Sequence, residues 1–431
     1  MRTYDLILKK RNGYPLDTEE ISYLINEYTT GQILDYQMAA WCMATYFTGM
    51  TDREISDLTM AMARSGEIMD LGTIQGRKID KHSTGGVGDT TTLIVAPLVA
   101  SCGVSVAKMS GKGLGHTGGT IDKLSSIPGF NSELTQDQFI RQVNDIHCAL
   151  VSQTGKLAPA DKLLYALRDV TATVDSIPLI ASSIMSKKIA AGADGFVLDV
   201  KTGSGAFMKE LSQAIELAKT MVSIGKQIDK PTVALVTDMN QPLGQMIGNA
   251  LEVKEAILTL ANQGPDDLTQ LCIALGAEML VLAEHSPDIL TAEKQLLTAL
   301  RQKTGLDKFK AMIRAQGGDE RIVDSPDRLP QAQYKIPIYS NQAGYIESID
   351  SLELGLAAMN IGAGREHKNS PIDLAVGLEL KKKIGDYVTI GEPIVIVHSN
   401  MASSDQEKIR AAYTFSDKKV SAVQLIHMRN T

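Results

Sequence analysis

Two segments in the first 65 residues carry apolar side chains at the spacing of one helix face, positions 21–28 and 55–62. Each follows the spacing of a capping box, in which an acidic or hydroxyl residue precedes glutamate by three positions. The two pairs are Asp17 with Glu20 and Thr51 with Glu54. A third helix is expected to begin at Asp35. The pattern therefore predicts a small helical domain over residues 1–65.

From about residue 78 the pattern changes to short apolar strands, glycine loops and helix-length segments. The predicted strands read VSVAKMSG at 104–111, GFVLDVKT at 195–202 and TVALVTD at 232–238. A helix is predicted over 179–191, because Pro178 suits a first helical turn. More helices are predicted over 247–300. Strands and helices that alternate in this way predict an α/β domain with a mostly parallel central sheet.

Residues 331–400 have a different pattern, in which short alternating stretches are separated by glycine and polar turns. The stretches are KIPIYS, GYIESI, LELKKKIG and EPIVIVHSN. Because no proline- or serine-rich linker precedes them, we expect residues 331–431 to form a C-terminal β-rich α+β subdomain packed on the α/β domain. The predicted fold class is therefore mixed α/β.

Composition narrows the classes of partner. The chain has 431 residues, 22% of them charged, and a formal net charge of −7. This charge argues against nucleic acid or an acidic membrane as the main partner, and no stretch reaches 18 uncharged apolar residues. The start has no signal-peptide pattern. The cysteines lie far apart and lack CxxC spacing, so we expect no zinc site, no disulfide framework and a cytoplasmic location. They are Cys42, Cys102, Cys148 and Cys272.

Six glycines and three lysines crowd the segment 108–130, KMSGKGLGHTGGTIDKLSSIPGF. Three of its glycines match GxGxxG, but Pro128-Gly129 closes the segment where a dinucleotide-binding fold needs a long crossover helix. The P-loop pattern also fails, because Gly111-Lys112 is followed by glycine instead of serine or threonine. The remaining interpretation is a composite anion site.

Two glycine loops offer the groups that enclose a phosphate, namely free backbone N–H groups, hydroxyls and lysines. The first loop carries Lys81, His82, Ser83, Gly85, Gly86, Gly88 and Thr92. The second carries Lys108, Ser110, Gly111, Thr117 and Thr120. A helix follows the first loop, and its N-terminus favours an anion by about 0.3–1 kcal/mol. For either loop taken alone, glycines that merely make tight turns remain the alternative.

Long blocks of the chain resemble the thymidine/pyrimidine-nucleoside phosphorylase family, and the resemblance runs essentially end to end. The blocks are DKHSTGGVGD, SGKGLGHTGGTIDKL, LAPADKLLYALRDVTATVDSIPLIASSIMSKKIAAGAD, LDVKTGSGAFM and GNALEVKEA. The resemblance implies a homodimer whose subunits have a helical domain, here 1–65 and 163–193, and an α/β domain, here 66–162 and 194–330. It also implies reversible phosphorolysis of pyrimidine nucleosides in the cleft between them, with uridine, thymidine and deoxyuridine as expected substrates.

The resemblance assigns roles position by position. Phosphate, the co-substrate, would contact Lys81, His82, Ser83, Thr92, Lys108, Met109, Ser110 and Thr120. The pyrimidine would contact Arg168, Ser183 and Lys187, and the catalytic residues would be His82, Arg168 and Lys187. No organic cofactor is implied. A potassium ion would lie at Gly88, Thr90, Leu243, Met246 and Glu255, partly on backbone carbonyls.

The roles of several residues have more than one interpretation. His82 could donate a proton to the base or only position it as a neutral imidazole, and His116 could latch the cleft or be a turn residue. Asp161 and Asp199 are predicted to be structural. Where the family usually has arginine and glutamate, this chain has Lys112 and Ser125, a change that would loosen the second loop.

Three alternative functions compete with the broad-specificity enzyme. A thymidine-specific phosphorylase would use the same residues. An anthranilate-type phosphoribosyltransferase would need acidic residues that hold Mg²⁺, and no convincing pair is present. A regulator would bind nucleosides without turning them over.

Overall fold

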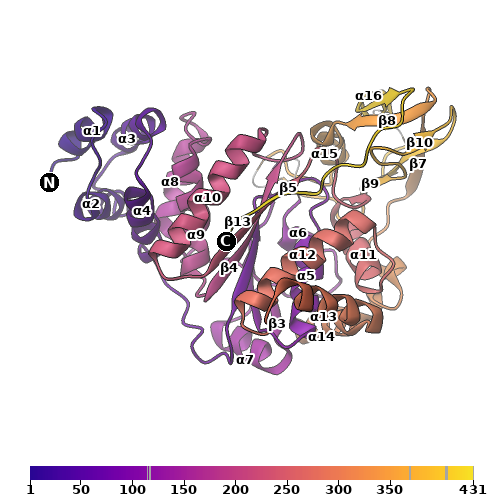
Figure 1. Ribbon diagram of the computed structural model, residues 1–431, viewed down its shortest axis with the longest axis horizontal. Helices are drawn as coiled ribbons and strands as arrows, with labels where there is room; N and C mark the ends of the chain where they lie inside the picture. Colours follow the sequence, from indigo (N-terminus) through magenta and orange to yellow (C-terminus); the bar gives the residue numbers. More distant parts are fainter. Residues whose placement is uncertain (114, 116–117, 368–369, 403–405, 431) are drawn as a thin grey trace.

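The computed structural model describes residues 1–113, 115, 118–367, 370–402 and 406–430. His116 and Thr117 lie outside the described residues. Figure 1 shows a helical bundle at one end, a central sheet covered by helices, and a β-rich part at the other end. The predicted fold class is confirmed by this arrangement.

The bundle contains α1 (Thr3–Arg11), α2 (Thr18–Thr29), α3 (Asp35–Thr48) and α4 (Asp52–Arg64). Both predicted capping boxes are present: the side chains of Asp17 and Thr51 accept the backbone N–H of the glutamate three residues on. The core of the bundle surrounds Trp41 and is completed by α8 (Pro159–Asp169), which comes from much later in the chain.

The central sheet has the order β1 (Ile79–Ser83), β4 (Gly195–Thr202), β5 (Thr232–Asp238), β13 (Ile426–Asn430). The first three strands are parallel and β13 is antiparallel to β5. A parallel pair, β2 (Val106–Ser110) and β3 (Cys148–Ser152), adjoins it through a bridge between Lys78 and Ser105. Residues 331–431 were expected to form one subdomain, but β13 lies in the central sheet, where it pairs with the edge of β5.

Helices cover both faces of the sheet (Figure 1). Helix α5 (Thr91–Ser101) is apolar on all sides because its neighbours bury it almost completely. Helix α9 (Ile177–Ala190) begins with Pro178 in its first turn, as predicted, and packs between α4 and α10 (Leu211–Gln227). The other helices are α6 (Thr120–Leu124), α7 (Gln136–Ile146), α11 (Asn249–Leu260), α12 (Asp266–Leu282), α13 (Ile289–Gln302) and α14 (Thr304–Ala315). No helix in these described ranges is long and apolar enough to span a membrane.

The C-terminal part contains two small antiparallel sheets, β6-β9-β11-β7 and β10-β8-β12. Their strands are β6 (Met246–Ile247), β7 (Tyr334–Tyr339), β8 (Gly344–Ile349), β9 (Gly377–Leu380), β10 (Tyr387–Val388), β11 (Pro393–Ser399) and β12 (Tyr413–Ser416), with helices α15 (Ser351–Asn360) and α16 (Gln406–Ala411). Its core also takes up Val87, from the first glycine loop, and Ile247. The subdomain therefore shares its core with residues of the α/β domain.

Candidate active site

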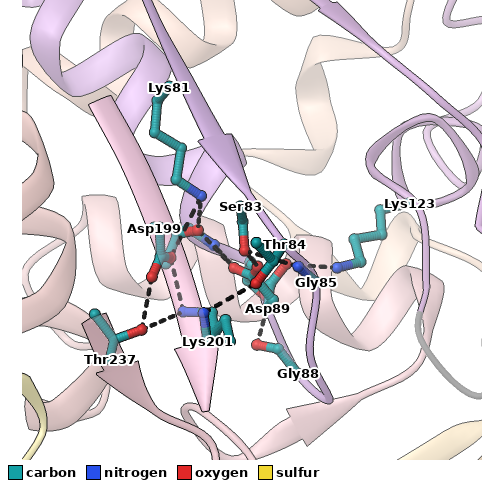
Figure 2. Close-up of polar contacts among 12 residues, drawn as sticks. Lys81, Ser83, Thr84, Gly85, Gly88, Asp89, Lys123, Asp199, Lys201 and Thr237 are labelled. Atoms are coloured by element: carbon teal, nitrogen blue, oxygen red, sulfur yellow. Dashed lines mark hydrogen bonds and ion pairs between the residues drawn. The ribbon is translucent and has the colours of Figure 1, made fainter. Parts of the chain in front are cut away.

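The first glycine loop leaves the carboxyl end of β1 and leads into α5. In proteins with an open parallel sheet, ligands bind at the carboxyl ends of the strands. Figure 2 shows Lys81 and Ser83 directed toward Asp89 and Asp199. The Lys81 ammonium donates to the Thr91 hydroxyl and lies 3.7 Å from Asp199 Oδ2, and the Ser83 hydroxyl donates to Asp89. Two predicted phosphate ligands thus meet in one polar cluster.

Asp89 is the centre of this cluster and was not singled out from the sequence. Besides Ser83, its carboxylate accepts the Thr91 hydroxyl at 2.5 Å. Burial disfavours the charged form, but the positive charges of Lys81, Lys201 and Lys123 outweigh this effect and hold the pKa of Asp89 below its ordinary value. The surroundings of Asp89 are therefore ones that stabilise an anion.

The second glycine loop follows β2, beside the first. The buried Lys108 Nζ lies 3.0 Å from Asp80 Oδ1, and Lys188 Nζ lies 3.0 Å from Asp80 Oδ2. Burial, opposed by Asp80 and aided by the neighbouring Lys188, lowers the pKa of Lys108 to about 7. Because Lys188 belongs to α9 and Asp80 to β1, this triad joins the two sides of the site.

The other predicted phosphate ligands lie around the same strand ends. Ser110 ends β2 and is half-buried, whereas Met109 is buried and its carbonyl accepts Lys188 Nζ at 3.5 Å. Thr92 lies in the first turn of α5, and Thr120 begins α6. Both threonines are half-buried.

The predicted pyrimidine ligands Ser183 and Lys187 share one face of α9, as their spacing of four residues requires. Lys187 Nζ donates to the Ser183 hydroxyl at 3.1 Å and to Asp161 Oδ2, on α8, at 2.6 Å. Asp161 was expected to be structural, and its observed contact is this ion pair, which orients Lys187.

Arg168 is 1% exposed, and its guanidinium is held by backbone carbonyls of the helical part. It donates to Thr173 O at 3.1 Å, Leu179 O at 3.1 Å and Val174 O at 2.5 Å. An arginine has five N–H donors, so the three bonds leave two for another group. Sequence reasoning assigned Arg168 to the base and did not anticipate that it also ties α8 to the start of α9.

Comparison with known proteins identifies the family. The family model described as "Glycosyl transferase family, a/b domain" matches residues 75–306, more than half of the chain. The helical bundle domain of the same family matches residues 4–66, and the pyrimidine nucleoside phosphorylase C-terminal domain matches residues 345–416.

Similar full-length proteins agree with these matches. Pyrimidine-nucleoside phosphorylase of Geobacillus stearothermophilus is 56% identical over 429 residues, which cover 99% of both chains. The proteins of that name from Bacillus subtilis and Staphylococcus aureus are 57% and 55% identical, over 94% and 99% of both chains. The chain belongs to the pyrimidine-nucleoside phosphorylase family.

A solved structure of anthranilate phosphoribosyltransferase from Thermus thermophilus shares the fold of this phosphorylase-family chain with a TM-score of 0.60. The likeness covers 72% of this chain and 99% of that one. Because sequence identity is 16%, the comparison shows a common architecture alone.

In this family member His82 lies near the end of β1 and is half-buried. Burial, together with the charges of Lys188, Lys108, Lys81 and Lys187, lowers the pKa of His82 well below its ordinary value. The imidazole is therefore neutral at pH 7. This environment favours the alternative in which His82 positions a substrate as a neutral hydrogen-bonding group.

The residues assigned to a potassium ion lie on facing segments. A Cβ placed on Gly88 would meet Leu243 O at 2.5 Å and Met246 O at 3.3 Å, so these carbonyls point into the space that glycine leaves. Thr90 Oγ1 lies 3.3 Å from Gly88 O. Glu255 Oε2 is buried and has no hydrogen-bond partner within the described part of the chain. Burial raises the pKa of Glu255 to about 8, because no positive charge among the described residues offsets the cost of burying its carboxylate. Carbonyl and carboxylate oxygens are the ligands that hard cations take.

The two departures from the family pattern lie on the outside of the second loop. Lys112 and Ser125 are both exposed. Ser125 follows the last residue of α6, and its hydroxyl donates to Ile121 O at 2.8 Å. This hydroxyl is therefore bonded to its own helix.

The site residues that the sequence did not reveal include three aspartates and two lysines, Lys188 and Lys201. Asp80 precedes Lys81, Asp89 ends the motif GGVGD, and Asp161 lies in the block LAPADK. Their proximity to lysine-bearing motifs was the available signal. Asp80 and Asp161 each pair with a lysine from another element, and the backbone carbonyl of Asp89 accepts Lys123 Nζ. Adjacency in the sequence does not reveal these contacts.

Proposed function

We propose that this chain catalyses reversible phosphorolysis of pyrimidine nucleosides, giving the free pyrimidine and ribose or deoxyribose 1-phosphate for nucleoside salvage. One observation carries the proposal. The helix with Ser183 and Lys187 is joined to the strand with Lys81 by the Lys188–Asp80 contact of 3.0 Å. A base-binding wall and an anion-binding wall therefore face one site, and the relatives bear the name of this activity over nearly the whole chain.

Phosphate would bind at the two glycine loops. The buried cluster there contains more lysines than aspartates, so it carries an excess positive charge. The lysines are Lys81, Lys108, Lys188 and Lys201, and the aspartates are Asp80, Asp89 and Asp199. Hydroxyls of Ser83, Ser110 and Thr120 and the loop N–H groups would direct the anion. An oxygen of phosphate then attacks C1′ of the sugar.

The C1′–N1 bond breaks as the C1′–O bond forms, and the electron pair of the broken bond leaves with the pyrimidine. The pyrimidine anion then takes up one proton from solvent, which balances the proton that hydrogenphosphate gives up. Lys187, held by Asp161, and the two free N–H donors of Arg168 would stabilise the charge that develops on the base. His82 would donate an N–H bond to the base as a neutral imidazole, because the surrounding lysines disfavour its protonated form.

A potassium ion would lie between Gly88 and the segment from Leu243 to Met246, and its charge would keep Glu255 ionised against the effect of burial, which raises the pKa of Glu255 to about 8. Such an ion would supply the positive charge that Glu255 Oε2 lacks and would hold the first loop in place. If so, the melting temperature of the protein should be higher in potassium chloride than in tetramethylammonium chloride, and Glu255→Gln should abolish the difference. Equal melting temperatures in both salts would contradict it.

The chain is proposed to act as a cytoplasmic homodimer. The exposed apolar side chains of the bundle support an interface there, because they lie on packed helices α1, α3 and the end of α8. They include Tyr4, Tyr36, Phe47 and Val170, which are 65%, 70%, 78% and 79% exposed. Sedimentation of Phe47→Glu against the native protein tests this interface, and an unchanged mass would contradict it.

The activity itself is tested by incubating the pure protein with uridine, thymidine, deoxyuridine and cytidine, with and without phosphate, and measuring base release. We expect release from the uracil and thymine nucleosides only with phosphate, with Lys81→Met inactive and the exposed Lys294→Met unaffected. Release of base from thymidine alone would favour the thymidine-specific alternative. A requirement for magnesium would favour the phosphoribosyltransferase alternative, and uridine that stays intact at every phosphate concentration would refute the proposal.

A further inference from the structure

The second glycine loop is fastened to the C-terminal subdomain by one arginine. Arg365 Nη1 and Nη2 donate to Asp122 Oδ2 and Oδ1 at 2.8 and 2.7 Å, which is a bidentate pair. Its side chain is 13% exposed and that of Asp122 is 5% exposed, so solvent screens the pair little. The two residues are 243 positions apart in sequence.

Backbone contacts extend this attachment along the loop. Gly113 N donates to Asp122 Oδ2 at 2.6 Å, and Gly113 O accepts Arg365 Nη1 at 3.1 Å. Gly115 N donates to Arg365 O at 3.0 Å. The approach is close, because a Cβ on Gly364 would lie 2.5 Å from Gly115 O. Arg365 therefore holds the described part of the loop through its backbone at Gly113 and Gly115 and through the side chain of Asp122.

The attachment acts on the helix that begins with a phosphate ligand. Asp122 and Lys123 both lie in α6, which starts at Thr120. Lys123 Nζ donates to Asp89 O, in the first loop, at 2.6 Å and pairs with Glu252 Oε2 at 2.6 Å. Adjacent residues thus tie α6 to the first loop on one side and to the C-terminal subdomain on the other. Figure 2 shows the Lys123 side of this arrangement.

We propose that Arg365 is a positioning residue for phosphate, acting through Asp122 on the second glycine loop. Arg365 lies in the C-terminal part, outside the matched helical bundle and a/b domains. The C-terminal subdomain thereby takes part in binding the anion. The inference rests on the proposed function. A loop held in its binding conformation loses less conformational entropy when the anion binds, so loss of the clamp should weaken phosphate binding more than the chemical step.

The test compares Arg365→Gln with the native protein by calorimetric titration with inorganic phosphate and by steady-state kinetics. We expect the Kd and KM for phosphate to rise about tenfold, the order for a lost charge-assisted bond, while kcat at saturating phosphate and KM for uridine change less than about twofold. Arg365→Lys should fall between the two, because lysine keeps the charge and loses the bidentate geometry. The matched control is Arg2→Gln, which breaks an exposed bidentate pair with Asp5 and should change nothing.

Hydrogen exchange separates positioning from general loss of stability. In Arg365→Gln we expect faster exchange at the amides of Gly113 and Gly115, with central strands β4 and β5 unchanged. In the Arg365→Gln background, Asp122→Asn should raise the Kd for phosphate by a smaller factor than it does in the native protein.

Phosphate Kd and KM within twofold of the native values in folded Arg365→Gln, or in Arg365→Lys if the former does not fold, would overturn the inference. Calorimetry needs no turnover. A protein that binds phosphate without releasing base therefore refutes the proposed activity and still decides the role of Arg365, whereas a native protein that binds no phosphate refutes both.

Discussion

Replacing Lys108 by methionine should remove a pH dependence from phosphate use. Burial lowers the pKa of Lys108 to about 7, and the cation that binds phosphate exists below that pH. About half of the side chains are protonated at pH 7 and about a tenth at pH 8. As pH rises through the pKa, the native protein therefore loses about tenfold in kcat/KM for phosphate per unit relative to the variant. At about pH 6 the native protein should exceed the variant about 10–100-fold, the effect of a charge-assisted hydrogen bond of about 1.5–3 kcal/mol.

The assay measures kcat/KM for phosphate for both proteins from about pH 6 to about pH 9, since this parameter reports the ionisation of the free enzyme. Methionine resembles the neutral lysine in length and packs in the same buried space. Ionisation of phosphate affects both proteins equally, so it cancels in the ratio of the two profiles. A ratio that stays constant over this range would show that Lys108 keeps an ordinary pKa or does not contact phosphate.

Three further outcomes are expected. His82→Ala, which removes the N–H donor, should lower kcat by about 100-fold and leave the phosphate KM near its native value; an unchanged kcat in uridine phosphorolysis assays would remove the role of His82. Arg168→Ala should lose turnover and base affinity, and full activity would displace Arg168 from the site. It should also lower the free energy of unfolding by about 3–5 kcal/mol, measured by urea denaturation, because three buried carbonyls lose their donor. Lys112→Arg with Ser125→Glu should lower the phosphate KM by up to about fivefold, the limit for an exposed ion pair, and a KM that does not move would show that these departures leave the loop unaffected.

Local features of the fold were predictable because their causes are local. The capping boxes at Asp17 and Thr51 need only residues three positions apart, and the strand over 232–238 follows from the short run TVALVTD, which is rich in β-branched residues. The final strand was not predicted, because β13 depends on an edge of β5 that the chain reaches only after folding. Its half-buried, mixed sequence has no strong strand pattern.

The candidate site also combines features with a local cause and features set by tertiary packing. By itself the sequence determined which residues could serve as ligands: lysines, hydroxyls and glycines in two loops, and Ser183 with Lys187 on one helix face. Only the tertiary structure decided their electrostatics. Asp80 lies between Lys108 and Lys188, Asp161 holds Lys187, and Arg365 reaches Asp122 across 243 positions. The physical reason is that charge interactions depend on distance and burial in space, and both are set when separate elements pack together.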